Sequence, residues 1–231
     1  MKHLPSFLAL CLLLLAGTAH AATGERAESK YTETSEVMTI EATWQRFGMD
    51  GPDALSDALV LEAVRSFRST AAQEHVELKD LRDKEGSVLP PFEMVLSGVI
   101  SDNGRTAGIL WQKYQYLGGA HGGLDVSSTN CTLPDGRVFR LTELFRKPDT
   151  ALRLLSERSR KELQRRGLPM DMVRSGTEPD IENFDTFLLT TDGLTLYFSP
   201  YQVAPWSEGV VTVSLSLDDL SEAEPVTAYW K

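Results

Sequence analysis

Hydrophobic and polar residues alternate along several short stretches of this chain, which is the pattern of strands with one buried face. Apolar side chains occupy every second position of residues 36–47 and again of residues 210–217. Residues 92–101 and 106–117 are two further strand-like runs, joined by an Asp-Asn-Gly sequence that favours a tight hairpin turn. A strand over residues 124–133 follows. We therefore expect antiparallel pairing in this part of the chain.

A second hairpin is indicated by residues 184–198, where two apolar runs flank a Thr-Asp-Gly turn. Helical spacing appears after Pro52, where apolar residues recur every four positions at Leu55, Leu59, Ala63 and Phe67. Residues 142–167 form a second helical stretch, and residues 168–182 look like a long connection. Hairpins with helices between them predict an α+β fold, in which antiparallel sheets pack against two or more helices, rather than a parallel βαβ array.

The first residues carry the features of a secretory signal. Residues 1–21 contain Lys2, a short apolar run and Ala19-His20-Ala21, which fits the small-x-small cleavage rule. Cys11 is a weaker candidate for a lipoprotein signal, because Leu10 stands directly before it where a small residue is needed. We expect a periplasmic or secreted protein that has no membrane span after cleavage.

The remaining chain divides by composition into four segments. Residues 22–35 lack large aliphatic side chains and read as a flexible lead-in. Residues 36–123 form an N-terminal α+β segment that ends in a glycine-rich loop. Residues 124–222 form a C-terminal α+β segment packed with the first as one unit, and residues 223–231 form a tail.

The chain is acidic, with a formal net charge of −10, and cleavage of the signal would remove Lys2 and make it one unit more negative. Nucleic acids and anionic membranes require basic patches, so both are unexpected partners. The charge suits a basic partner, although an acidic surface also simply keeps an exported protein soluble. Cys131 would be the one thiol of the mature chain, most simply a buried small hydrophobe, and no internal disulfide is expected.

Four glycines surround one histidine in the stretch from Gly118 to Gly123, called the glycine loop below. Such a density indicates positive φ angles or close backbone approach. His121 would lie at the rim of a sheet, where it either binds a ligand or holds the loop through a bond to a neighbouring backbone group. Catalysis by His121 with Asp125 is a weaker alternative, since no G-x-S-x-G elbow occurs. We expect no metal and no cofactor, because the mature chain has few histidines.

A family resemblance rests on four motifs taken in order. They are the run from Tyr116 to Gly122, Leu141-Thr142-Glu143-Leu144-Phe145, Thr191-Asp192-Gly193-Leu194, and Pro200-Tyr201 with Ala204-Pro205 before Gly209. Over residues 37–221 the chain resembles an exported bacterial family. This family includes the extracellular domain of lysozyme-sensing anti-sigma factors of the RsiV type, the non-catalytic N-terminal region of PdaC-type peptidoglycan deacetylases, and a secreted mycobacterial immunogenic protein.

The resemblance implies an α+β unit whose work is recognition, since the domain of the anti-sigma branch binds lysozyme. The chain lacks the cytoplasmic segment and membrane helix of that branch, so we expect no sigma-regulating role. The candidate binding residues are Gly118, Gly119, His121, Gly122, Tyr116, Tyr201, Pro205 and Trp206. The expected partner is a lysozyme-like protein or peptidoglycan glycan, with an envelope hydrolase and a structural accessory domain as alternatives.

Overall fold

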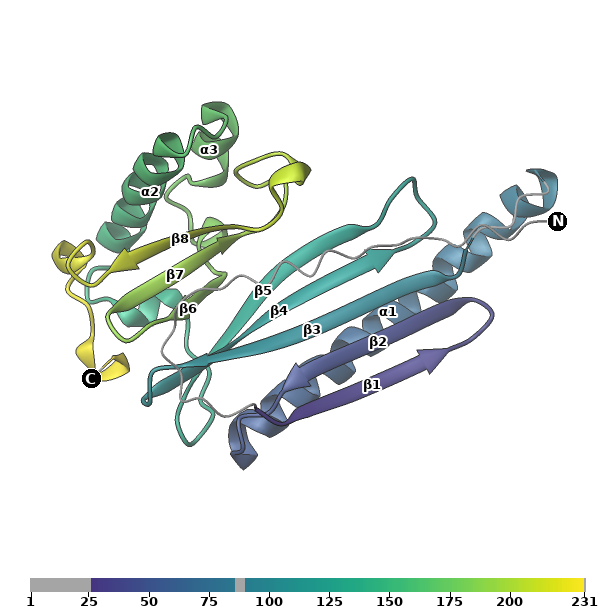
Figure 1. Cartoon of the computed structure of the whole chain (residues 1–231), viewed down its shortest axis with the longest axis horizontal. Coiled ribbons are helices and arrows are strands. Elements are labelled where there is room, and N and C mark those ends of the chain that lie inside the picture. Colours follow the sequence, from purple (N-terminus) through teal and green to yellow (C-terminus); the bar gives the residue numbers. More distant parts are fainter. Residues whose placement is uncertain (1–25, 86–89, 231) are drawn as a thin grey trace.

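The computed structural model describes residues 26–85 and 90–230 and contains two sheets (Figure 1). The first has five strands in the order β1-β2-β3-β4-β5, and the second has three in the order β6-β7-β8. The strands are β1 (Glu28–Thr34), β2 (Met38–Gln45), β3 (Phe92–Asp102), β4 (Thr106–Tyr116), β5 (Gly123–Thr132), β6 (Phe187–Leu189), β7 (Gly193–Phe198) and β8 (Val211–Ser216). The helices are α1 (Asp50–Glu85), α2 (Pro148–Arg165) and α3 (Met170–Gly176). The predicted α+β class is confirmed.

Helix α1 connects β2 to β3, and these two strands run parallel. All other pairs are antiparallel, so the described chain contains one βαβ unit that the sequence did not indicate. The helix covers one face of the first sheet (Figure 1). Its buried stripe is Val60, Val64, Phe67 and Ala71, whereas Leu59 of the expected stripe is 36% exposed. The buried stripe has spacings of four, three and four residues, whereas the expected stripe has a uniform spacing of four. Both contain Phe67, so apolar spacing alone could not separate them.

Residues 28–34 form β1 instead of the flexible lead-in expected for residues 22–35. The strand pairs along its whole length with β2, from Glu28 opposite Gln45 to Thr34 opposite Thr39. Glu33 accepts a hydrogen bond from Nε of Arg68 on α1 at 2.9 Å. Polar side chains thus join this edge strand to the helix, which explains why it lacks the aliphatic residues of a core strand.

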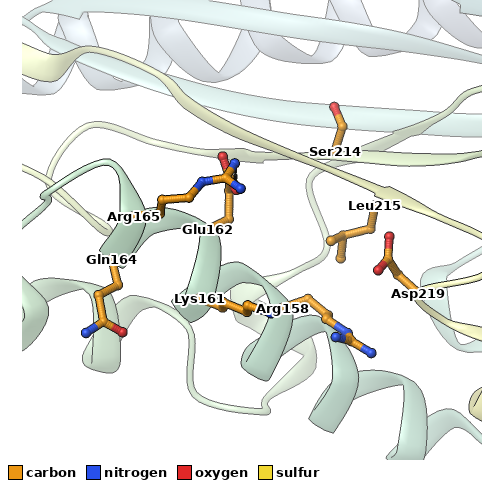
Figure 2. A pocket seen from close by; sticks show the side chains of 8 residues that line it. All are labelled: Arg158, Lys161, Glu162, Gln164, Arg165, Ser214, Leu215 and Asp219. Atoms are coloured by element: carbon orange, nitrogen blue, oxygen red, sulfur yellow. Dashed lines mark hydrogen bonds and ion pairs between the residues drawn. The ribbon is translucent and has the colours of Figure 1, made fainter.

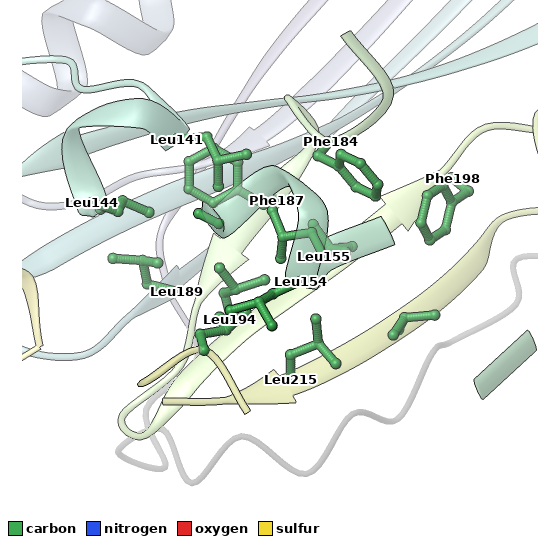
Figure 3. Packing of buried hydrophobic residues seen from close by; sticks show 14 of the residues in the cluster. Leu141, Leu144, Leu154, Leu155, Phe184, Phe187, Leu189, Leu194, Phe198 and Leu215 are labelled. Atoms are coloured by element: carbon green, nitrogen blue, oxygen red, sulfur yellow. The ribbon is translucent and has the colours of Figure 1, made fainter. Parts of the chain in front are cut away.

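The second sheet packs against α2 around a separate hydrophobic core (Figure 3). Leu154 and Leu155 of the helix are buried against β7 and β8, and Phe184 and Phe198 meet edge to face. The segment expected as a C-terminal tail also belongs to this core. Trp230 is 4% exposed, and its indole N–H donates to the Gly193 carbonyl at 2.8 Å.

The two sheets are joined through β5. This strand pairs with β4 along its length, so the boundary expected between residues 123 and 124 is wrong, and the two main cores divide between Leu133 and Phe139. Leu110, Val126 and Leu188 form a small cluster between the sheets. The side-chain amide of Asn130 donates to the Phe187 carbonyl at 2.8 Å. These contacts pack the second sheet against the first.

Two further expectations concern other segments. Residues 168–182, expected to be a connection, contain α3, whose Val173 is buried in the second core. The predicted signal peptide of residues 1–21 lies outside the described residues. Within the described part of the chain, none of the helices combines the length and the apolar character needed to cross a membrane.

Candidate functional site

Two loops that are far apart in the sequence lie side by side. The glycine loop follows β4, and residues 199–210, called the β7–β8 loop below, connect the last two strands. The ring centroids of His121 and Trp206 are 6.0 Å apart, and those of Tyr201 and Trp206 are 5.8 Å apart. We call His121, Tyr201 and Trp206 the aromatic cluster.

The aromatic cluster is open to solvent. Tyr201 is 58% exposed, Trp206 is 38% exposed, and His121 is also exposed. Exposed aromatic side chains gathered at one place are typical of surfaces that bind proteins or stack on sugar rings, whereas scattered ones need no explanation. The cluster therefore forms a surface patch with the composition of a recognition site.

The β7–β8 loop is fixed from behind by polar contacts. The Val126 N–H of β5 donates to Oγ of Ser199 at 3.3 Å, which ties the loop to the first sheet. The Gln202 side-chain amide donates to the carbonyls of Gly176 and Asn183 at 3.2 and 3.1 Å. Tyr201 has a φ of 71°, a conformation that L-residues seldom adopt. These contacts hold the loop so that Tyr201 points outward.

Gly176 at the end of α3 supports the same loop by its small size. A Cβ atom at this position would lie 2.0 Å from the carbonyl oxygen of Gln202. The helix can approach the loop backbone only because no side chain intervenes. This contact and the one through Ser199 could not be predicted from the sequence, because neither residue stands in a motif and each meets its partner only in the folded chain.

The glycine loop needs its glycines at two positions. Gly118 has a φ of 89°, and a Cβ atom at Gly122 would lie 2.3 Å from Cζ of Tyr114. Nδ1 of His121 is 2.9 Å from the Gly122 carbonyl oxygen, so in the tautomer with hydrogen on Nδ1 it donates a hydrogen bond there. This is the contact with a neighbouring backbone group that was expected as the alternative to ligand binding.

The other predicted site residues lie around the cluster. Gly119 is exposed, and a Cβ atom there would have 3.8 Å to the nearest atom, so no contact requires a glycine at this position. Pro205 is exposed and directly precedes the 3₁₀ turn Trp206–Glu208. Tyr116 is half-buried on β4 opposite Glu93, and within the described residues no ring contact joins it to the aromatic cluster. Tyr116 is thus beside the patch rather than in it.

His121 and Asp125 have different partners. Asp125 lies 3.6 Å from the Lys113 ammonium. Together with Trp111 they line a groove of about 390 Å³ between α1 and strands β4 and β5. Across residues 26–85 and 90–230, neither a hydrogen bond nor an ion pair joins Asp125 to His121. A search of the same residues finds no group of three His, Cys, Asp or Glu side chains placed to hold a metal ion.

Cys131 is a buried free thiol, as expected. Burial raises its pKa to about 11, with a smaller contribution from the negative charge of Asp135. The thiol is therefore protonated at neutral pH and unreactive in the folded chain.

Part of the chain matches a known family. Residues 142–218 match the family described as "Protein of unknown function (DUF3298)". The match includes α2, the second sheet and the β7–β8 loop, but not the glycine loop. Two solved structures show the same fold. A DUF3298 family protein from Pseudomonas aeruginosa PAO1 superposes with a TM-score of 0.61 at 18% identity, covering 90% of this chain and 96% of that one. A DUF3298 family member from Bacteroides fragilis NCTC 9343 gives 0.58 at 16% identity, covering 90% and 97%.

One curated relative is a peptidoglycan deacetylase. The peptidoglycan-N-acetylmuramic acid deacetylase PdaC of Bacillus subtilis strain 168 is 29% identical over 114 residues, which are 48% of this chain. Those residues span 24% of the relative, so the chain corresponds to about a quarter of its length. The peptidoglycan deacetylase part of the predicted resemblance is confirmed. Similarity to the anti-sigma factors and to the mycobacterial protein stays a prediction.

Proposed function

We propose that this protein is a non-catalytic recognition domain of the cell envelope and that the aromatic cluster binds peptidoglycan glycan. The observation that carries the proposal is the meeting of His121, Tyr201 and Trp206 on one exposed patch. Aromatic faces bind the apolar faces of sugar rings, while the Tyr hydroxyl, the indole N–H and the imidazole can hydrogen-bond to sugar hydroxyls. The named activity of the deacetylase relative supports peptidoglycan as the polymer.

The rigidity of the patch supports recognition further. Gln202, Ser199 and Gly176 fix the β7–β8 loop before any partner arrives. A preorganised surface loses less conformational entropy on binding than a mobile one. The same contacts hold Tyr201 in its uncommon backbone conformation, which is a feature that accumulates at functional surfaces.

A basic lysozyme-like protein is the second candidate partner, and the charge of the chain favours it. The net charge of −10 would attract a cationic protein over a distance, and Glu208 lies exposed two residues from Trp206. Aromatic side chains serve as binding hot spots in protein interfaces as well. An envelope hydrolase that uses His121 and a carboxylate, and a structural accessory domain, are the remaining alternatives.

The test is a titration of wild-type protein and Trp206→Ala with two probes, soluble peptidoglycan glycan strands and lysozyme, at low and high salt. We expect Trp206→Ala to weaken glycan binding by about 2 kcal/mol or more, as aromatic hot spots do. Salt should hardly change glycan binding. An association rate with lysozyme that falls steeply with salt would identify the second candidate instead.

The controls separate binding from stability and catalysis. Leu61→Ala removes another exposed hydrophobic side chain, on α1 and outside the aromatic cluster, and should leave glycan binding unchanged. Trp206→Ala should keep the melting temperature of wild type, because Trp206 is not buried. If the wild-type protein turns the glycan over and His121→Gln abolishes that turnover, the hydrolase alternative is favoured. Unchanged glycan binding by Trp206→Ala would contradict the proposal.

A further inference from the structure

A second candidate site lies between α2 and the edge strand β8 (Figure 2). It is a pocket of about 440 Å³. Its lining combines three basic residues, two acidic ones, one amide of α2 and two residues of β8: Arg158, Lys161, Arg165, Glu162, Asp219, Gln164, Ser214 and Leu215. Neither the glycine loop nor the aromatic cluster contributes to it, so the pocket is separate from the proposed glycan surface.

Two cations in this pocket have no ion-pair partner. Glu162 is already bound by Arg165 and by Nε of Arg166, the latter at 2.9 Å. In the part of the chain that the structure describes, no carboxylate lies within ion-pair distance of Arg158 or Lys161. On a chain with a net charge of −10, two unpaired cations in one pocket indicate a site for an external anion.

The carboxylate of Asp219 faces these cations, and it accepts its hydrogen bonds from Ser216 in the same turn. Asp219 Oδ2 accepts from Oγ of Ser216 at 2.7 Å and from its backbone N–H at 3.1 Å. These bonds lower the pKa of Asp219, and the charges of Arg158 and Lys161 lower it further. Asp219 therefore stays ionised and in place without forming an ion pair with either cation.

Arg158 also carries an unsatisfied donor. Its Nε atom is buried and has no hydrogen-bond partner in the described residues. A buried N–H without an acceptor is costly, and native proteins nearly always satisfy such groups with protein, water or a ligand. Figure 2 shows the Arg158 side chain reaching from α2 toward the side of the pocket that holds Asp219. The guanidinium thus lines the pocket with one of its donors still unsatisfied.

The edge of β8 adds backbone groups. The N–H of Leu217 donates to Asp192, on the side of β7, whereas that of Ser216 donates to Asp219 on the opposite side. Backbone groups of alternate residues point to the same edge of a strand, so the N–H and C=O of Ser214 also face away from β7. Arg166 bonds the Thr212 carbonyl at 2.8 Å, which closes the other end. Ser214 is thus the one outward-facing position between these two capped residues, and it lies beside the pocket.

We propose that this pocket binds the carboxyl-terminal end of a short peptide, with its carboxylate held by Arg158 and Lys161. The position at Ser214 suits a single peptide unit, since the neighbouring edge positions are already capped. Glu162 and Asp219 disfavour a multiply charged anion such as phosphate, while a monoanionic carboxylate is compatible with them. Arginine matches a carboxylate through two parallel N–H groups. The proposal does not depend on glycan binding by the aromatic cluster.

The experiment is a calorimetric titration of the whole chain with alanyl-alanine dipeptides, in the all-D and the all-L form, each with a free carboxylate or a C-terminal amide. We expect saturable binding of a free acid, with Kd on the order of 1 mM as fits so small a ligand. The amide should bind about tenfold more weakly, because the charge-assisted bonds are lost. Preference for the D form would indicate an envelope peptide as the source, and preference for the L form an ordinary protein C-terminus.

Variants locate the site. Arg158→Gln and Lys161→Gln should each weaken binding of the free acid about tenfold. Lys161 is exposed, so its variant reports on the pocket even if loss of Arg158 disturbs folding. Arg153→Gln, on the same helix but paired with Glu157, is the matched control and should bind as wild type does. Trp206→Ala should also be unaffected, which separates this site from the glycan surface.

Three results would overturn the assignment. They are the absence of saturable binding for both free-acid dipeptides, equal binding of acid and amide, and wild-type binding of the free acid by both Arg158→Gln and Lys161→Gln.

Discussion

At the scale of single residues, Trp206 and Tyr201 are exposed because the groups behind them fix the loop that carries them. Ser199 bonds to β5, and Gln202 bonds to α3 and the segment after it. The exposure of Trp206 could be predicted, since it stands between Pro205 and a Ser-Glu-Gly turn. The distance from Trp206 to His121 could not be predicted, because the fold of the 84 residues between them determines it.

Neighbouring glycines of the glycine loop should respond differently to alanine. Gly122→Ala places a methyl group 2.3 Å from the Tyr114 ring, whereas nothing lies within 4 Å of a Cβ atom at Gly123. We expect Gly122→Ala to destabilise the protein by about 1 to 3 kcal/mol through overpacking. Gly123→Ala should stay within about 0.5 kcal/mol of wild type. Urea unfolding of both variants measures this, and equal stabilities would show that Tyr114 does not pack on Gly122.

At the scale of elements, β2, β3 and β8 could be predicted from period-two alternation, because one face of each is buried. The core residues Ile40 and Ala42 of β2 follow this pattern, and Asn103-Gly104 forms the turn expected between β3 and β4. β1 was not predicted, because the contacts that stabilise it are polar and join it to Arg68 on α1. α3 was not predicted either, because its seven residues are too few to show a helical period.

The attachment of β1 to α1 should depend on pH. Hydrogen bonds from Arg68 and Tyr31 lower the pKa of Glu33 below its ordinary value of 4.5. A lowered pKa in the folded state adds stability above the unfolded pKa, and this stability is lost as pH falls through the folded value. Glu33→Gln should therefore reduce the free energy of unfolding at pH 7, and the difference from wild type should shrink toward about pH 3.

Unfolding in urea at both pH values provides the measurement. Glu28→Gln, on the same strand and exposed, is the control and should change little at either pH. A deficit of Glu33→Gln that is as large at low pH as at neutral pH would show that ionisation of Glu33 does not stabilise the strand.

At the scale of the whole molecule, the proposed site exists because the two sheets are joined through β5. Val126 contributes its side chain to the cluster between the sheets and its N–H to the β7–β8 loop. The sequence motifs of the two loops could be identified, and their assignment to one surface was a hypothesis. The pairing of β4 with β5 and the packing of Leu188 on Leu110 bring the loops together, and the sequence does not show either contact.

The central claim is that the glycine loop and the β7–β8 loop form one recognition surface, and a double-mutant cycle tests it most directly. His121→Ala, Trp206→Ala and the double variant are titrated with soluble peptidoglycan glycan strands. Residues in contact with one ligand and with each other couple, so the double variant should differ from the sum of the single effects by about 0.5 kcal/mol or more. Effects of the two substitutions that simply add, or single variants that bind as wild type does, would contradict the account.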